Sequence, residues 1–250
     1  MKKSIAILLL VAAFWVGIPN ANAARVFDGS NDYISMADND ALTLQAGDWT
    51  IGCMVRTDTT AGTDRQTIID NESGLNYIEL VVFDASNATV PRRNNVRMAV
   101  GDGTNEFSIL GTGAPFASNT TPTAVYVVRS GDTITNYVAG SADGSVSVTG
   151  LGAVNGTVSM RFGSDASGAA NQFWDGDIAE CAAWNRALSD AELTGLAEGF
   201  SPRCYPIGRM WYVPHRGDLN ELQKGIAVTN GPSTEATTIG AHPRTFDCGE

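Results

Sequence analysis

The sequence predicts an all-β fold of short antiparallel strands, with one short C-terminal helix and an appended tail. Three observations support this class. Short apolar segments with alternating patterns recur along the chain, turn-forming residues separate them, and 27 Gly in 250 residues favour strands and turns over long helices. Many short strands at this spacing indicate an antiparallel sandwich or barrel rather than strand–helix–strand units.

The strands are predicted from alternation, most clearly in 49–55, where Trp49, Ile51, Cys53 and Val55 share one face. Ser130-Gly131-Asp132 marks a hairpin turn. The segments expected to form strands are 49–55, 66–70, 77–83, 96–100, 106–110, 123–129, 133–138, 145–148, 158–162 and 175–184.

A single helix is expected at 189–197. Ser189 followed by Glu192 forms a capping box at its start, and Gly199 and Pro202 stop it. The side chains expected to face the sandwich are Leu188, Leu193 and Leu196.

The first 23 residues predict a secretory signal peptide. Lys2 and Lys3 precede an uncharged run at 5–18, and Ala21-Asn22-Ala23 fits cleavage after Ala23. The run is shorter than the ~20 residues of a spanning helix, so we expect no transmembrane anchor after cleavage. The mature chain is expected outside the cytoplasm, either secreted to the extracellular space or periplasmic.

The net charge argues against one class of partner. The chain has 16 Lys+Arg, 27 Asp+Glu and a formal charge of −11, which becomes −13 when cleavage removes two lysines and no acid. So acidic a protein repels phosphate backbones, and we expect no nucleic-acid partner.

The four cysteines suit an oxidising compartment. They form no Cys-x-x-Cys pair, so zinc is not indicated. We favour a Cys204–Cys248 disulfide that staples the tail, with Cys53 and Cys181 as neighbours in the core. Cys53 and Cys181 as buried free thiols are the alternative.

Four segments resemble the laminin G-like domain family, and together they span roughly 25–200. They are Phe27-Asp28-Gly29-Ser30-Asn31-Asp32-Tyr33-Ile34, Asp48-Trp49-Thr50-Ile51, Phe173-Trp174-Asp175-Gly176-Asp177-Ile178-Ala179-Glu180 and the helix segment 184–193. The resemblance implies a concanavalin A-like fold at 24–200, a two-sheet antiparallel jelly-roll sandwich. This domain is expected to lie between the signal peptide at 1–23 and an extension at 201–250. Such domains usually bind glycans or proteins without catalysis, often with calcium.

The calcium ligands that this resemblance implies are Asp28, Asp32, Asp175 and Asp177, because the family places their two segments near each other. Carboxylate oxygens are ligands that calcium prefers. The alternative is that these aspartates only form surface turns.

Asp175, Asp177 and Glu180 also resemble the Glu-x-Asp-x-x-Glu strand of jelly-roll glucanases, which use paired carboxylates. Asp175 stands where that pattern has Glu, so we expect no catalytic residue. In the structural alternative, Glu180 accepts hydrogen bonds from neighbouring strand or loop groups.

Aromatic and amide side chains are the remaining candidates for ligand contact. Trp49, Trp174 and Trp184 occupy strand positions and are expected in the core. Loop residues suit a sugar site better, but the sequence singles out none of Asn71, Asn105, Phe116 and Asn119.

We therefore expect a secreted, non-enzymatic recognition or adhesion module that binds a glycan or protein, with calcium as its cofactor. The second expectation is a structural or assembly component of an extracellular or virion particle. The third is a glycoside hydrolase that uses Asp175, Asp177 and Glu180. The extension resembles tails of phage and prophage-associated laminin G-like proteins, and we expect it to pack on the sandwich or on a neighbouring subunit of a homo-oligomer.

Overall fold

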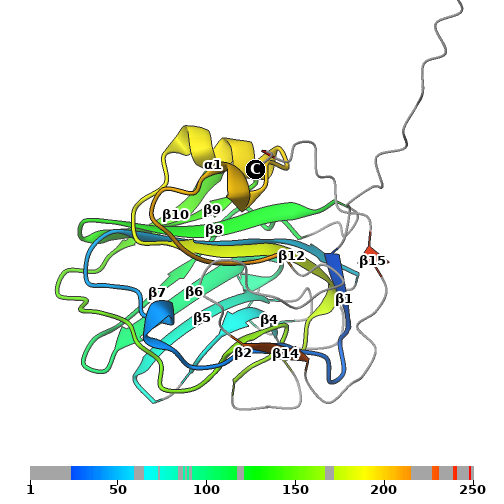
Figure 1. The fold of residues 1–250 in the computed structure, drawn as a ribbon, viewed down its shortest axis with the longest axis horizontal. Helices are drawn as coiled ribbons and strands as arrows, with labels where there is room; N and C mark the ends of the chain where they lie inside the picture. The colour runs from blue at the N-terminus through cyan, green and yellow to red at the C-terminus, as the bar shows by residue number, and fades with distance from the viewer. Residues whose placement is uncertain are drawn as a thin grey trace, which may run out of the picture.

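A computed structural model describes residues 24–58, 65–72, 74–83, 87, 89, 92–116, 121–166, 172–214, 227–230, 239–240 and 248. The predicted signal peptide and its cleavage after Ala23 lie outside these residues and stay predictions. The described part is a sandwich of two antiparallel sheets with one α-helix on its outside (Figure 1). None of its helices is long and apolar enough to span a bilayer.

Sheet A contains eight strands in the described residues, in the order β10-β9-β8-β3-β12-β1-β15, and β13 also pairs with β12. The strands are β1 (Ala24–Asp28), β3 (Trp49–Thr57), β8 (Thr123–Ser130), β9 (Thr133–Val138), β10 (Ser141–Ser147), β12 (Asp175–Trp184), β13 (Arg209–Val213) and β15 (Ile239–Gly240).

Sheet B contains seven strands in the same part of the chain, in the order β14-β2-β11-β4-β5-β6-β7. They are β2 (Ile34–Met36), β4 (Arg65–Asp70), β5 (Asn76–Phe83), β6 (Val96–Asp102), β7 (Glu106–Leu110), β11 (Met160–Phe162) and β14 (Val228–Asn230). Two short 3₁₀ helices, η1 (Asp40–Leu42) and η3 (Pro202–Cys204), lie in connecting segments.

The main core lies between the sheets and buries the predicted face of β3, including Trp49 and Ile51. A second apolar cluster covers the outer face of sheet A, where Tyr126 and Trp184 pack against Leu193 and Leu196 of the helix α1 (Asp190–Ala197). Both faces of sheet A are therefore buried at its centre, which explains why neither β3 nor β12 contains an exposed residue.

The helix begins as predicted. The Ser189 side chain accepts from the backbone N–H of Glu192, and the Glu192 carboxylate accepts from the backbone N–H of Ser189, so the capping box is confirmed. The three leucines expected to face the sandwich, Leu188, Leu193 and Leu196, are all buried.

The largest difference between a predicted and an observed strand start is at β10, which begins at Ser141 rather than at 145. Ala139 and Gly140 have φ angles of 50° and 78° and join β9 directly to β10. Two consecutive positive φ values are the geometry of a type I′ hairpin turn. Alanine rarely adopts a positive φ angle, so the dipeptide Ala139-Gly140 gave little indication of a turn in the sequence.

The predicted Cys204–Cys248 disulfide is present, and Cys53 and Cys181, for which the sequence left two alternatives open, also form a disulfide. Cys53–Cys181 joins the neighbouring strands β3 and β12 inside the core, so these residues are not free thiols. Cys204–Cys248 joins η3 to the far end of the extension. Strand β13 pairs with β12, β14 with β2 and β15 with β1, so the described strands of the extension pack on the sandwich of their own chain.

Candidate ligand-binding face

The outer face of sheet B lies on the side of the sandwich away from α1 (Figure 1). In β5, Ile78, Leu80 and Val82 point into the core, so Tyr77, Glu79 and Val81 point outward by strand alternation. We call this outward surface the sheet B face.

A row of polar residues crosses the sheet B face from edge to edge. The strand register aligns each one opposite the next, and antiparallel partners place their side chains on the same side. Only one member is apolar, and the row consists of Thr229, Ser35, Arg161, Asp70, Glu79, Ala99 and Ser108.

Glu79 is the centre of an ion-pair network on this face. It is buried, and its carboxylate contacts Arg65 at 2.6 Å and also Arg97. A buried carboxylate is costly unless it is paired, and two guanidinium groups supply that pairing. Both arginine side chains remain about one quarter exposed, so they present positive charge at the surface of the face.

Tyr77 lies beside this network at one end of the face. Burial, followed by a hydrogen bond and charge repulsion from Glu106, raises the pKa of Tyr77 to about 12. Its hydroxyl is therefore neutral at any physiological pH: it donates its proton to Glu106, and its oxygen can still accept a hydrogen bond.

Three carboxyl groups gather where β4 and β11 end. Asp70 is the last residue of β4, Glu72 follows it, and Asp165 follows β11, which pairs with β4. One oxygen of each carboxyl group lies within 4.8 Å of an oxygen of the other two. Asp70 and Asp165 are buried, whereas Glu72 is exposed. We call Asp70, Glu72 and Asp165 the acid cluster.

The chain holds Asp70 firmly in place. The backbone N–H groups of Glu72 and Ala166 each donate to a different oxygen of its carboxyl group at 2.7 Å. Burial nevertheless raises its pKa to about 7, and repulsion from Asp165 and Glu79 adds to this. Burial and the same two acidic neighbours also raise the pKa of Glu72.

The donor set of the acid cluster fits a calcium ion. Calcium binds oxygen at about 2.3–2.6 Å, so two oxygens that share one ion lie at most about 5 Å apart. All three carboxyl groups meet this limit. Repulsion among three acids is the electrostatic condition that a divalent cation relieves. The sequence analysis missed this group, because Asp70 and Asp165 are brought together only by the pairing of β4 with β11.

The four aspartates predicted as calcium ligands lie elsewhere, at the ends of β1 and β12. Asp28 pairs with Asp175, and Asp32 accepts a bond from the Asp28 backbone N–H at 3.1 Å. The Asp177 carboxylate accepts from Arg56 Nε at 2.7 Å. Among the described residues these four do not form a group of three mutually close carboxylates, as the acid cluster does. Their calcium role stays a prediction.

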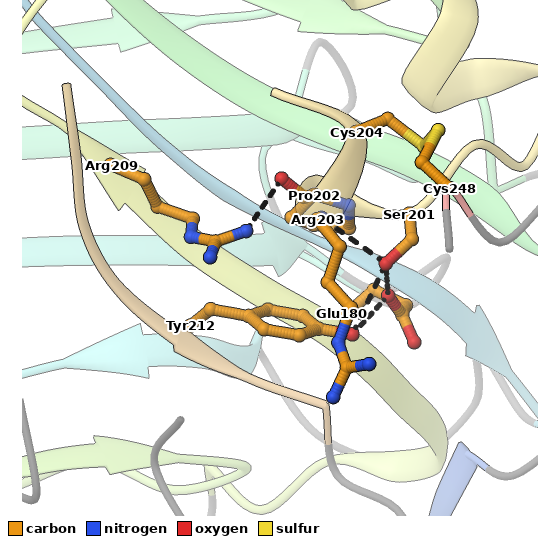
Figure 2. Close-up of a disulfide and its surroundings, with 8 residues drawn as sticks. All are labelled: Glu180, Ser201, Pro202, Arg203, Cys204, Arg209, Tyr212 and Cys248. Atoms are coloured by element: carbon orange, nitrogen blue, oxygen red, sulfur yellow. Dashed lines mark hydrogen bonds between the residues drawn. A yellow bond between two sulfur atoms is a disulfide. The ribbon is translucent and has the colours of Figure 1, made fainter. Parts of the chain in front are cut away.

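Two of the three residues of the hydrolase hypothesis, Asp177 and Glu180, are engaged in side-chain contacts within the protein. Asp177 is buried against Arg56, and Glu180 lies in a bulge of β12 with φ of 53°. The Glu180 carboxyl group accepts from Tyr212 Oη at 2.6 Å and from Ser201 Oγ at 3.0 Å (Figure 2). The predicted role of Glu180 as a hydrogen-bond acceptor is confirmed.

Substituting Tyr212 with Phe tests this buried contact. Removing the hydroxyl leaves the Glu180 carboxyl group with one donor fewer, and a hydrogen bond to a charged group contributes about 1.5–3 kcal/mol. We expect Tyr212→Phe to lower the free energy of unfolding by about that amount in a urea titration. Tyr137→Phe, which removes an exposed bond to Asp190, should cost less than about 0.5 kcal/mol; equal losses would contradict the prediction.

The other candidate contacts divide into three groups. Trp49, Trp174 and Trp184 are fully buried, as predicted. The suggestion of Asn71 and Phe116 as sugar contacts is wrong, because both side chains are buried. Asn71 accepts from the Ile78 backbone N–H to close a turn, and Phe116 packs edge-on against Trp174. Asn105 ties two loops together by donating to Gly150, and Asn119 lies outside the described residues.

Comparison with solved structures shows the fold. A putative carbohydrate binding protein from Bacteroides ovatus is 15% identical with a TM-score of 0.60, and the match covers 84% of this chain and 58% of that one. A heptameric SAP-like pentraxin from Limulus polyphemus is 14% identical with a TM-score of 0.53, and the match covers 88% and 100%. Domains LG4-5 of the mouse laminin alpha1 chain are 13% identical with a TM-score of 0.51, and the match covers 67% and 44%.

No curated protein matches the chain. A family model does, over residues 28–194, which is more than half of the chain and includes the acid cluster. That span agrees with the segments that resemble laminin G-like domains. The chain belongs to the Laminin_G_3 family of the concanavalin A-like lectin/glucanases superfamily.

Proposed function

We propose that this chain is a secreted, non-enzymatic recognition module that binds a glycan or protein ligand on the sheet B face with the help of calcium. The observation that carries the proposal is the acid cluster, which includes Asp70, the middle member of the polar row. Asp70, Glu72 and Asp165 would hold the ion. When bound, calcium supplies open coordination positions for oxygen atoms of a ligand.

The arrangement of the sheet B face supports recognition. Arg65 and Arg97 offer donors beside Glu79, and Tyr77 adds a neutral hydroxyl. Hydroxyl-rich or peptide ligands are held by such convergent polar groups. The laminin G-like fold, the putative carbohydrate-binding relative and the two disulfides also favour extracellular binding over catalysis.

The test combines calcium titration with ligand screening. Isothermal calorimetry on the mature protein should show saturable calcium binding that Asp70→Asn and Asp165→Asn weaken at least about tenfold, equivalent to about 1.4 kcal/mol. Asp28→Asn is the matched control, because it removes an acid from the alternative set at the end of β1, and it should leave calcium binding unchanged.

A glycan array with calcium and with a chelator completes the test. We expect saturable binding in calcium that Arg97→Ala and Asp70→Asn reduce. If Asp28→Asn lowers the calcium affinity instead, the calcium site is at the aspartates predicted from the sequence and not at the acid cluster. Calcium binding without any glycan or protein ligand would contradict the recognition role and favour the structural alternative.

A further inference from the structure

The outermost strands on one side of the sandwich both come from the extension. Strand β15 is the outer neighbour of β1 in sheet A, and β14 is the outer neighbour of β2 in sheet B. Only residues 29–33 separate β1 from β2 in the sequence. The two edges therefore lie on the same side of the molecule, and the extension covers both.

The covering strands are short and make few pairs. Three residues of β14 pair with β2, and two residues of β15 pair with β1, although β1 itself has five. Their contribution to the sheet ladders is small compared with that of the long central strands. Attachment at both ends of the segment must therefore help to keep them in place.

Both ends of this segment are fixed beside Glu180 (Figure 2). Before β14, the chain is held by β13, whose Tyr212 donates to Glu180. After β15, Cys248 is bonded to Cys204 in η3, close to Ser201, which also donates to Glu180. The disulfide closes the segment into a loop that returns to its starting point, so the chain gains less conformational entropy when β14 and β15 leave their edges while the bond is intact.

We propose that β14 and β15 act as edge guards: they occupy the surface at which a second copy of this chain would otherwise pair, and Cys204–Cys248 holds them there. An uncovered strand edge presents a row of unpaired N–H and C=O groups that recruits another chain. Without β14 and β15, this side of the sandwich would present two such edges, β1 from sheet A and β2 from sheet B.

A second copy fits this surface better than an isolated extended peptide. A twofold axis would pair β1 with the β1 of the other copy and β2 with its β2 at the same time. One added strand would cover a single edge and leave the other open. The inference does not depend on the sheet B face or on calcium, so it can fail while the proposed function holds.

The test is a variant that ends at residue 226 and carries Cys204→Ser. It loses β14 and β15 but keeps β13 and the Glu180 contacts, and it has no free thiol. Sedimentation velocity over a concentration series should show a monomer for the oxidised full-length protein. The truncated variant should dimerise with a dissociation constant at least about tenfold lower than that of the full-length protein.

Adding Val26→Lys to the truncated variant is the matched control. Val26 lies in the middle of β1 and is half-buried, and a lysine there should block edge pairing and restore the monomer. A truncated variant that keeps its near-ultraviolet circular dichroism and stays monomeric would overturn the proposal. So would association that Val26→Lys does not reduce, because it would not depend on the edge of β1.

Selective reduction gives a second measurement if the truncated chain does not fold. Cys248 is exposed, whereas Cys53 and Cys181 are fully buried, so mild reductant followed by alkylation should open Cys204–Cys248 first. The alkylated full-length protein should then dimerise in the same concentration range as the truncated variant. A reduced and alkylated protein that remains monomeric would overturn the role assigned to the disulfide.

Discussion

Between pH 4 and pH 7 the Asp70 carboxyl group is expected to lower the unfolding free energy of the calcium-free protein by up to about 4 kcal/mol as the pH rises. The cause is the pKa of Asp70, which burial and then the nearby Asp165 and Glu79 raise from 3.8 to about 7 in the folded state. In the unfolded chain the group keeps its ordinary value, so in this window the folded state binds the extra proton.

The direction follows from proton linkage. Stability falls with increasing pH wherever the folded state binds more protons than the unfolded state. The contribution of Asp70 is therefore fully favourable below pH 3.8, declines through the window and is lost above about pH 7. This is opposite to an ordinary salt-bridged aspartate, whose contribution is lost as the pH falls.

The measurement is the unfolding free energy of wild type minus that of Asp70→Asn, from urea titrations in chelator at several pH values. Taking the difference removes the other titrating groups, and the lost hydrogen-bond acceptor adds only a constant offset. Asp102→Asn is the control, because backbone N–H groups of Asn105 and Gly152 lower the pKa of Asp102, and its difference should be flat from pH 5 to 7. A flat difference for Asp70 as well would contradict the prediction.

The parts of the fold that could be predicted from the sequence depend on neighbours along the chain. The alternation of 49–55 identified the core face of β3, and the capping box at Ser189 and Glu192 located the start of α1. Glu180 could be assigned a structural role because a buried acid needs donors, although the sequence did not show that Tyr212 and Ser201 provide them.

The acid cluster could not be predicted in this way, because it depends on strand order. Asp70 and Asp165 lie 95 positions apart, and only the pairing of Arg161 with Asp70 brings the end of β11 to the end of β4. The one available signal was that Asp70 ends one expected strand, 66–70, and Asp165 closely follows another, 158–162. Asp28 and Asp175 were easier to connect, because the family resemblance already placed their segments together, and the pairing of β1 with β12 does bring them opposite each other.

Removing the Cys53–Cys181 disulfide is expected to have the largest effect on stability. The bond joins residues 128 positions apart, and in the chain-entropy model a loop of that length contributes about 5 kcal/mol by restricting the unfolded chain. Cys53→Ala with Cys181→Ala should lower the unfolding free energy by about that amount, since both side chains are fully buried and the lost sulfur contacts add to the cost.

The location of the Cys53–Cys181 bond makes this loss global. Cys53 lies in the central strand β3 and Cys181 beside the β12 bulge, so the bond joins two strands that pack on the main core and on α1.

Cys204→Ser with Cys248→Ser is the informative control. The Cys204–Cys248 bond closes only the extension, so its loss should release β14 and β15 before the sandwich unfolds. Calorimetry should therefore show one transition at a lower temperature for the first variant and an early, smaller transition for the second. A first variant within about 1 kcal/mol of wild type would contradict the prediction. It would mean that residual structure in the unfolded chain already keeps the segments of β3 and β12 together without the bond.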